Sequence, residues 1–215
     1  MKPSLFTKIL DDRSLDEAIE TAADVVYDGV EIMARDPHLP PDTPTDRAES
    51  IRAVADRCGV ELPCLATYTG RYASLSDKEC EAELATFEQY LELSDILYIE
   101  LLRHLPGGPS VRHATDDDFE RAAEWLRRAA DRAAAYDRTI GLETHSHMFA
   151  ETTESTLRLV DAIDRENVGV IHDASNIFIV DDDFDPASID RLGDHLAHVH
   201  DTVNRFLPVP MPHPK

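Results

Sequence analysis

Short apolar runs alternate along the chain with longer stretches in which apolar residues recur every three or four positions. The short runs have the length of buried strands, and the longer stretches have the period of amphipathic helices. Strands are expected over residues 5–10, 30–34, 61–68, 96–102, 139–143, 168–171 and 196–199, and helices over residues 15–27, 45–58, 77–93, 116–136, 152–163 and 186–192. This alternation predicts a parallel sheet with right-handed crossovers.

The seven predicted strands are one fewer than a closed (β/α) barrel requires. After His200, 15 residues remain, and four of them are prolines, which disfavour a further strand or helix. We therefore expect a single α/β domain over residues 1–215, a TIM-type (β/α) barrel with parallel strands that lacks the eighth strand. Two explanations stay open: the chain is a truncated form of a longer protein, or the barrel is open between its first and seventh strands.

Three of the predicted strands have, at or just beyond their carboxyl ends, side chains of the types that bind divalent metal ions. These are Glu143, Asp173 and His200, separated by about 30 residues, roughly one strand and one crossover helix. The carboxyl ends of parallel strands meet at one rim of a barrel, where barrel enzymes have their active sites. Two carboxylates and an imidazole suit Mg²⁺, Mn²⁺, Co²⁺ or Zn²⁺. The spacing therefore predicts a metal-dependent barrel enzyme.

The side chains at these strand ends also have structural interpretations. Glu143 could cap the strand or pair with an arginine, and Asp173 could accept a hydrogen bond in the following turn. In the last strand we expect His200 to face the metal and His198 to be packed. Because side chains alternate between the faces of a strand, His172 should point away from the ligand side and be structural.

Four other residues are expected to be solvated or packed. Tyr68, Arg103 and His104 lie near the ends of the third and fourth predicted strands. Trp125 lies in the long helix, where we expect it to belong to the core.

The charge of the chain limits its partners. Acidic residues outnumber basic ones by 43 to 21, which gives a net charge of −22. Such a surface repels nucleic acid and anionic lipid, and the four lysines against 17 arginines suggest a salt-loving host. No apolar run reaches the ~20 residues of a membrane span, and no signal peptide is evident at the first residues. We expect a cytoplasmic protein whose three cysteines are reduced.

Several segments resemble the sugar phosphate isomerase/epimerase family. They are residues 29–31 (GVE), 141–145 (GLETH), 169–176 (GVIHDASN), 197–200 (AHVH) and 204–205 (NR). Their order and spacing carry the resemblance, which covers essentially the whole chain and is best over residues 141–205. This family has xylose isomerase-like barrels and includes ketose 3-epimerases, inosose dehydratases and endonuclease IV-like proteins.

The resemblance implies that Glu143, Asp173 and His200 bind a divalent metal (Mn²⁺, Mg²⁺, Co²⁺ or Zn²⁺). The family usually has a fourth ligand, a glutamate on the eighth strand, which also exchanges a substrate proton with the glutamate of the fifth strand. Because this sequence ends before that strand, a two-base epimerisation could not proceed as in the family. Glu143 is our candidate general base, acting on a carbon acid next to a metal-chelated carbonyl.

Four further residues are candidates for binding the substrate. His145 falls on the same side of the strand as Glu143 if the strand continues. Asn176 lies where related sequences often have His or Asn near the metal, and the planar guanidinium of Arg205 suits a hydroxyl or a phosphate. Glu31 could contact the substrate or support the site, although an internal ion pair is an equal alternative.

The expected function is a metal-dependent isomerase or epimerase of a small sugar or polyol. A homodimer is an expected assembly, since such barrels often dimerise. A lyase-type or non-catalytic relative that binds a metal and a sugar-like ligand stays open because of the missing strand. An endonuclease IV-like repair enzyme is disfavoured, since DNA binding needs a basic face.

Overall fold

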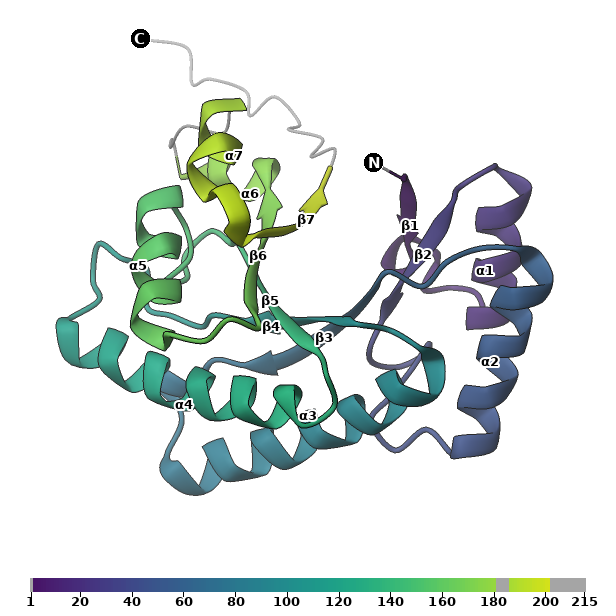
Figure 1. The fold of residues 1–215 in the computed structure, drawn as a ribbon, viewed down its shortest axis with the longest axis horizontal. Helices are drawn as coiled ribbons and strands as arrows, with labels where there is room; N and C mark the ends of the chain where they lie inside the picture. Colours follow the sequence, from purple (N-terminus) through teal and green to yellow (C-terminus); the bar gives the residue numbers. More distant parts are fainter. Residues whose placement is uncertain (1, 181–185, 202–215) are drawn as a thin grey trace, which may run out of the picture.

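A computed structural model describes residues 2–180 and 186–201 (Figure 1). Seven parallel strands form one sheet in the order of the sequence, from β1 to β7. They are β1 Ser4–Phe6, β2 Gly29–Met33, β3 Cys64–Gly70, β4 Leu101–Leu105, β5 Thr139–Glu143, β6 Val168–Asp173 and β7 Leu196–His200. Within the described residues no eighth strand joins β7 to β1, which confirms a TIM-type barrel that lacks one strand.

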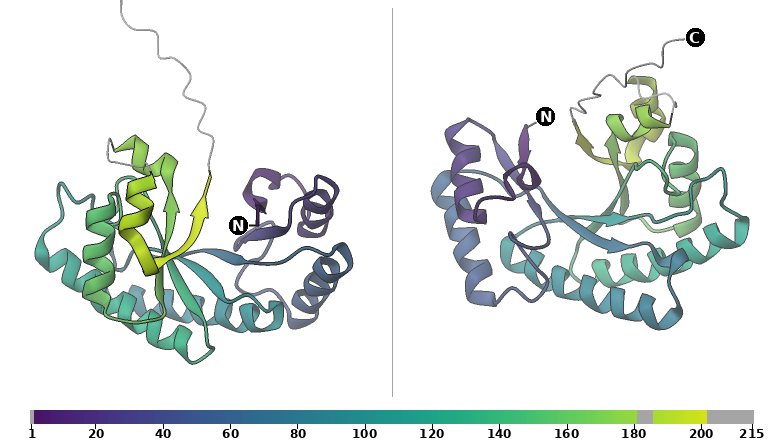
Figure 2. Two further views of the ribbon diagram at one scale, coloured as in Figure 1. Left: turned by 45° about the horizontal axis from the view of Figure 1, so that its top comes forward. Right: turned by 180° about the vertical axis from the view of Figure 1, so that it is seen from behind.

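The sheet curls so that its two edge strands approach each other, and the helices cover its outer side (Figures 1 and 2). The α-helices are α1 Leu15–Asp24, α2 Thr45–Cys58, α3 Asp77–Leu97, α4 Asp116–Ala134, α5 Thr153–Ile163, α6 Ala174–Ile179 and α7 Pro186–Leu192. Three short 3-10 helices are η1 Thr7–Leu10, η2 Tyr72–Ser74 and η3 Gly193–His195. None of the described helices is long and apolar enough to cross a membrane.

Local sequence signals explain where four of the helices begin and where α2 ends. The Ser14 hydroxyl accepts a hydrogen bond from the Glu17 backbone N–H, and the Glu17 carboxylate accepts one in return from Ser14. The same capping box begins α3, α4 and α5. Gly59 ends α2 with a φ of 69°, a left-handed conformation that glycine adopts without a steric penalty.

The first predicted strand is wrong over most of its length. Instead of extending over residues 5–10, β1 ends at Phe6, and Thr7–Leu10 turns into η1. The buried Thr7 hydroxyl accepts a hydrogen bond from the Met33 N–H (2.9 Å) and lies 2.8 Å from His38 Nδ1. These contacts hold the turn, and they leave Ile9 70% exposed although it belongs to an apolar run.

The boundaries of the third and fourth predicted strands were also wrong. The sequence predicts a strand over residues 96–102, but α3 continues to Leu97 and β4 begins only at Leu101. A short apolar run does not distinguish a strand from the last turn of a buried helix. Similarly, β3 begins at Cys64 rather than at residue 61, because Pro63 has no N–H to donate to a sheet.

Two helix predictions need correction. The first helix ends at Asp24 instead of residue 27. The six-residue helix α6, directly after β6, was not expected. Its N-cap is Asp173, whose carboxylate accepts a hydrogen bond from the Asn176 backbone N–H (2.9 Å). The sequence signal for this helix was therefore Asp173, the same residue that we predicted to bind metal.

His104 packs in the interior, as expected. Its ring stacks on Tyr72, meets Phe87 edge-on, and has its nitrogens 3.1 Å from Thr69 Oγ1 and 3.0 Å from the Tyr72 hydroxyl. Tyr72 stacks in turn on Trp125, which is buried in the core as predicted. Complete burial lowers the pKa of His104 to about 3 from its ordinary value of 6.5. His104 is therefore neutral in the folded protein.

A pH titration of stability tests this assignment. Because the folded-state pKa of His104 is lowered, its contribution is fully present above pH 6.5 and is lost as the pH falls toward 3. Between pH 6.5 and 5 this loss amounts to about 1.5 to 2 kcal/mol. We expect His104→Gln to lose correspondingly less unfolding free energy than the wild type over that interval in urea titrations. The exposed His113→Gln is the control, and equal slopes for all three proteins would contradict a neutral His104.

Candidate metal centre and cleft

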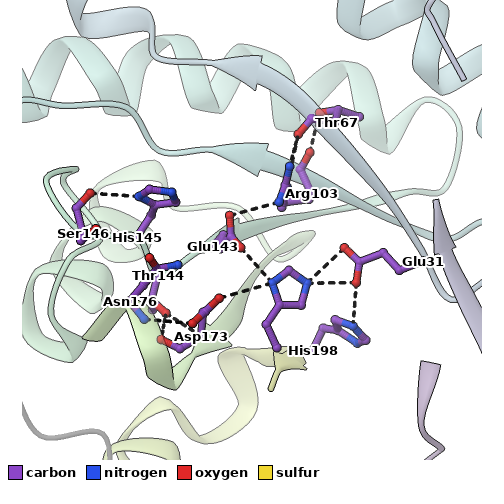
Figure 3. A network of polar contacts seen from close by, with 11 residues as sticks. Glu31, Thr67, Arg103, Glu143, Thr144, His145, Ser146, Asp173, Asn176 and His198 are labelled. Atoms are coloured by element: carbon purple, nitrogen blue, oxygen red, sulfur yellow. Dashed lines mark hydrogen bonds and ion pairs between the residues drawn. The ribbon is translucent and has the colours of Figure 1, made fainter. Parts of the chain in front are cut away.

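The three predicted ligands meet at the carboxyl ends of neighbouring strands. His200 Nδ1, from β7, lies 2.8 Å from Glu143 Oε1 on β5 and 3.9 Å from Asp173 Oδ2 on β6. One donor atom from each residue falls within 4.8 Å of the other two. All three residues are buried or nearly so. The curl of the sheet thus brings together side chains that are separated by helices in the sequence (Figure 3).

The other nitrogen of His200 faces a second carboxylate. Its Nε2 lies 3.0 Å from Glu31 Oε2, and His198 Nε2 lies 3.3 Å from the same oxygen. Glu31 belongs to β2, so this contact reaches across the gap between the two ends of the sheet (Figure 3). For Glu31 we predicted either a contact with the substrate or an internal ion pair, and the structure shows it paired with His198 and His200 inside the site. His198 is half-buried beside Glu31 rather than packed within the sheet as expected.

Burial and the neighbouring charges act in opposite directions on these groups. Burial by itself would lower the pKa of His200, but hydrogen bonds and charge interactions with Glu143 and Glu31 raise it to about 10. Burial would likewise raise the pKa of Glu31, yet the hydrogen bonds from His198 and His200 lower it to about 2. Without a metal, the imidazolium of His200 therefore lies between two carboxylates at neutral pH.

Arg103 is the residue of the site that the sequence analysis underestimated. It is 4% exposed, and its Nη1 lies 3.3 Å from Glu143 Oε2. Its Nε and Nη2 both donate to the carbonyl oxygen of Thr67, at 3.3 and 3.2 Å. An arginine inside the apolar fourth strand was the available signal, because a buried cation requires a partner.

Glu143 is consequently held from two sides. Burial raises the pKa of its carboxyl group, but the His200 hydrogen bond and the charge of Arg103 outweigh burial and lower it. An ionised carboxylate with one oxygen toward Arg103 and the other toward His200 is suited to holding a cation.

Asp173 has the two roles that the sequence left as alternatives. Oδ1 caps α6 at the Asn176 N–H, while Oδ2 is the atom nearest His200. Two contacts hold its backbone: its N–H donates to the Thr144 hydroxyl (2.7 Å), and its carbonyl oxygen accepts from the same hydroxyl (3.3 Å). The cap therefore orients the side chain that we predicted to bind metal.

The remaining predicted residues lie at different places. His145 and Asn176 line the cleft next to the ligands, with His145 Nδ1 2.9 Å from the Ser146 carbonyl oxygen. Arg205 lies outside the described residues. His172 points away from the cleft, as expected, with Nε2 3.1 Å from Ser188 Oγ on α7.

The cleft above these residues has a volume of ≈1190 Å³. It extends between the edge strands β1 and β7, and its lining includes Phe6, Tyr68, Arg71 and Arg103. The Phe6 ring stacks on His200 at a centroid distance of 5.9 Å. A ligand of this cleft would meet an apolar ring, two guanidinium groups and the carboxylates.

The donor set fits a divalent cation. Three carboxylates (Glu31, Glu143 and Asp173) lie against one guanidinium and one imidazolium, which leaves one negative charge. Replacing the proton of His200 by a divalent ion would make the cluster neutral. Oxygen and imidazole donors of this kind suit Zn²⁺, Mn²⁺, Co²⁺ or Mg²⁺.

Comparison with known proteins agrees with this architecture. A family model described as "Xylose isomerase-like TIM barrel" matches residues 19–208. A curated inosose dehydratase from Lacticaseibacillus casei is 32% identical over 89 residues, which are 41% of this chain and 29% of that protein. The match thus spans less than a third of the relative's length.

Solved structures show the same fold at low identity. A D-psicose 3-epimerase from Clostridium cellulolyticum H10, solved with D-tagatose, has a TM-score of 0.79 at 21% identity. The alignment covers 93% of this chain and 72% of that one. The IOLI protein, solved with a zinc atom, has a TM-score of 0.75 at 18% identity and covers 95% and 74% of the two chains.

Metal binding can be tested by thermal unfolding. We expect the melting temperature of the EDTA-treated protein to rise when Mn²⁺, Mg²⁺, Co²⁺ or Zn²⁺ is added. At a hundredfold excess over Kd the gain of about 2.7 kcal/mol corresponds to roughly 5 to 10 °C. Glu143→Gln should remove most of this rise, because it replaces a carboxylate ligand by a neutral amide. The exposed Glu49→Gln should retain it, and a wild type that responds to none of the ions would contradict the site.

Glu31 should act on metal affinity through His200. Its carboxylate lies against His200 Nε2 and so favours the tautomer in which Nδ1 is free to bind a metal. We expect Glu31→Gln to weaken metal affinity by about 10- to 100-fold, as measured by competition with a chelating dye. Unchanged affinity would show that Glu31 does not orient the ligand.

Proposed function

We propose that this chain, which belongs to the family of xylose isomerase-like TIM barrels, is a divalent-metal-dependent isomerase or epimerase of a small sugar or polyol. The observation that carries the proposal is the meeting of Glu143, Asp173 and His200 at the carboxyl ends of three successive strands. These side chains line a cleft large enough for a monosaccharide.

Glu143, Asp173 and His200 would hold the metal ion. A bound divalent ion polarises a carbonyl group and an adjacent hydroxyl group, which makes the neighbouring C–H bond more acidic. The protein supplies the orientation of the ligands: Glu31 fixes the ring of His200, and the α6 cap fixes Asp173.

Glu143 is the proposed general base. Its carboxylate is ionised because its pKa is lowered, so it can accept a proton over the whole neutral range. The Arg103 contact with Oε2 lowers the basicity of Glu143. In the proposed reaction the same positive charge would stabilise negative charge that develops on the substrate. His145 and Asn176 would contact substrate hydroxyl groups from the same wall of the cleft.

A water elimination is the second candidate, and one observation favours it. Epimerisation by two bases needs a carboxylate on each face of the substrate. Among the described residues, the carboxylate across from Glu143 is Glu31, which is engaged by His198 and His200. A single base suffices for isomerisation or for loss of water, and the curated relative is named a dehydratase.

The biological setting is part of the proposal. We place the protein in the cytoplasm and propose small polar substrates without nucleic acid, because a net charge of −22 repels phosphate backbones. A homodimer is the proposed assembly.

Proton exchange with solvent tests the reaction. The metal-loaded protein in D₂O should incorporate deuterium next to the carbonyl of a ketose, detected by NMR in a panel that includes D-fructose and D-tagatose. A new sugar would identify an isomerase or epimerase, and an unsaturated or deoxy product would identify a dehydratase. Glu143→Gln should lower the exchange rate by at least about a hundredfold, whereas Glu49→Gln should not. A metal-loaded protein that exchanges no C–H proton in any ketose or polyol-derived ketone would overturn the proposal.

A further inference from the structure

We propose that Tyr68 and Arg103 form an anion-binding subsite beside the proposed metal ligands, so that the preferred substrate carries a carboxylate or phosphate group. The inference rests on the proposed function, since it names the class of substrate for the same cleft.

Tyr68 is held between two positive charges. Its ring lies 4.2 Å from the guanidinium carbon of Arg35 and 4.7 Å from that of Arg103, measured to the ring centroid. Tyr68 lines the cleft, yet its hydroxyl oxygen is buried and has no hydrogen-bond partner of acceptable geometry in the described part of the chain. Buried hydroxyl groups normally have a partner, so this one has the features of a group that binds a ligand.

Arg103 has unused hydrogen-bonding capacity next to this hydroxyl. A guanidinium has five N–H donors, and the contacts of Arg103 to Glu143 and Thr67 use three of them. The other two make no hydrogen bond of acceptable geometry within the described residues, although Arg103 interacts electrostatically with the Tyr68 phenol, and the side chain that carries them is buried and lines the cleft.

The chemistry of the ligand follows from this set of donors. A sugar hydroxyl donates as well as accepts, and it is best matched by a mixture of donors and acceptors. The acceptors nearest Arg103, Glu143 Oε2 and the Thr67 carbonyl oxygen, already receive its N–H groups. The phenol and the free guanidinium donors instead match a group that only accepts, such as a carboxylate or phosphate. The positive charges of Arg35 and Arg103 favour such a group further.

The test compares ligands that differ in charge. Calorimetric titration of the metal-loaded protein would use D-fructose as the neutral probe, D-gluconate as the carboxylate probe and D-fructose 6-phosphate as the phosphate probe. Tyr68→Phe removes only the hydroxyl and keeps the ring between the two arginines. Tyr98→Phe is the matched control, because Tyr98 is 75% exposed.

We expect the wild type and Tyr98→Phe to bind one anionic probe more tightly than D-fructose. Tyr68→Phe should weaken that binding by about tenfold or more and leave D-fructose unaffected. Its melting temperature should equal or exceed that of the wild type, since a buried hydroxyl without a partner is removed. Preference for gluconate or for the phosphate ester identifies which anion the subsite accepts.

Two results would overturn the inference. One is equal affinity of wild type and Tyr68→Phe for both anions, and the other is a clear loss of stability in Tyr68→Phe, which would show that the hydroxyl is structural. The metal-dependent rise in melting temperature, measured on the same samples, separates this failure from failure of the proposed function. If metal raises the melting temperature but the anionic and neutral probes bind equally well, the proposed function stands and only the anion-binding subsite is rejected.

Discussion

The imidazole of His200 between Glu143 and Glu31 is the interaction on which the site depends. Strands β1 and β7 are not paired in the described sheet, so its curvature is not maintained by a closed ring of backbone hydrogen bonds. His200 links β7 to β5 through one nitrogen and to β2 through the other, and its ring stacks on Phe6 of β1. This one side chain thus connects both ends of the sheet and is also a proposed metal ligand.

Such a cluster is costly to bury unless its charges are compensated. Removing carboxylates from water requires partners with good geometry. Arg103 and His200 supply them in the absence of a metal, and the resulting pKa directions, raised for His200 and lowered for Glu31 and Glu143, describe the same compensation. A proton on His200 and a divalent cation are therefore alternative occupants of the centre of the cluster. The centre of this cluster therefore attracts a cation. In a chain of net charge −22, an anionic substrate would need positively charged groups in the cleft, and Arg103, which lines the cleft, is such a group.

On the outer surface, ion pairs connect neighbouring helices. Arginines on one helix pair with acidic residues on a neighbouring helix, as in the contacts of Arg128 on α4 with Glu81 on α3 and of Arg158 on α5 with Asp116 on α4. Exposed pairs of this kind contribute little individually to stability. They do show that several of the few arginines of this acidic chain each pair with an acidic residue of a neighbouring element. Most of the acidic side chains face solvent.

The sequence by itself determined the alternation of strands and helices and the positions of Glu143, Asp173 and His200 at strand ends, because hydrophobic period and capping act over a few residues. The end of β1 at Phe6 depended on distant contacts, such as that of Thr7 with Met33. The late start of β4 was missed because a short apolar run does not distinguish a strand from the last turn of a buried helix. Tertiary structure alone decided that Glu31 lies against His200, that Arg103 pairs with Glu143 and that Tyr68 lies between two arginines. These pairings depend on how far the sheet curls. That curvature results from the packing of all the strands and helices together and is not encoded in any short segment.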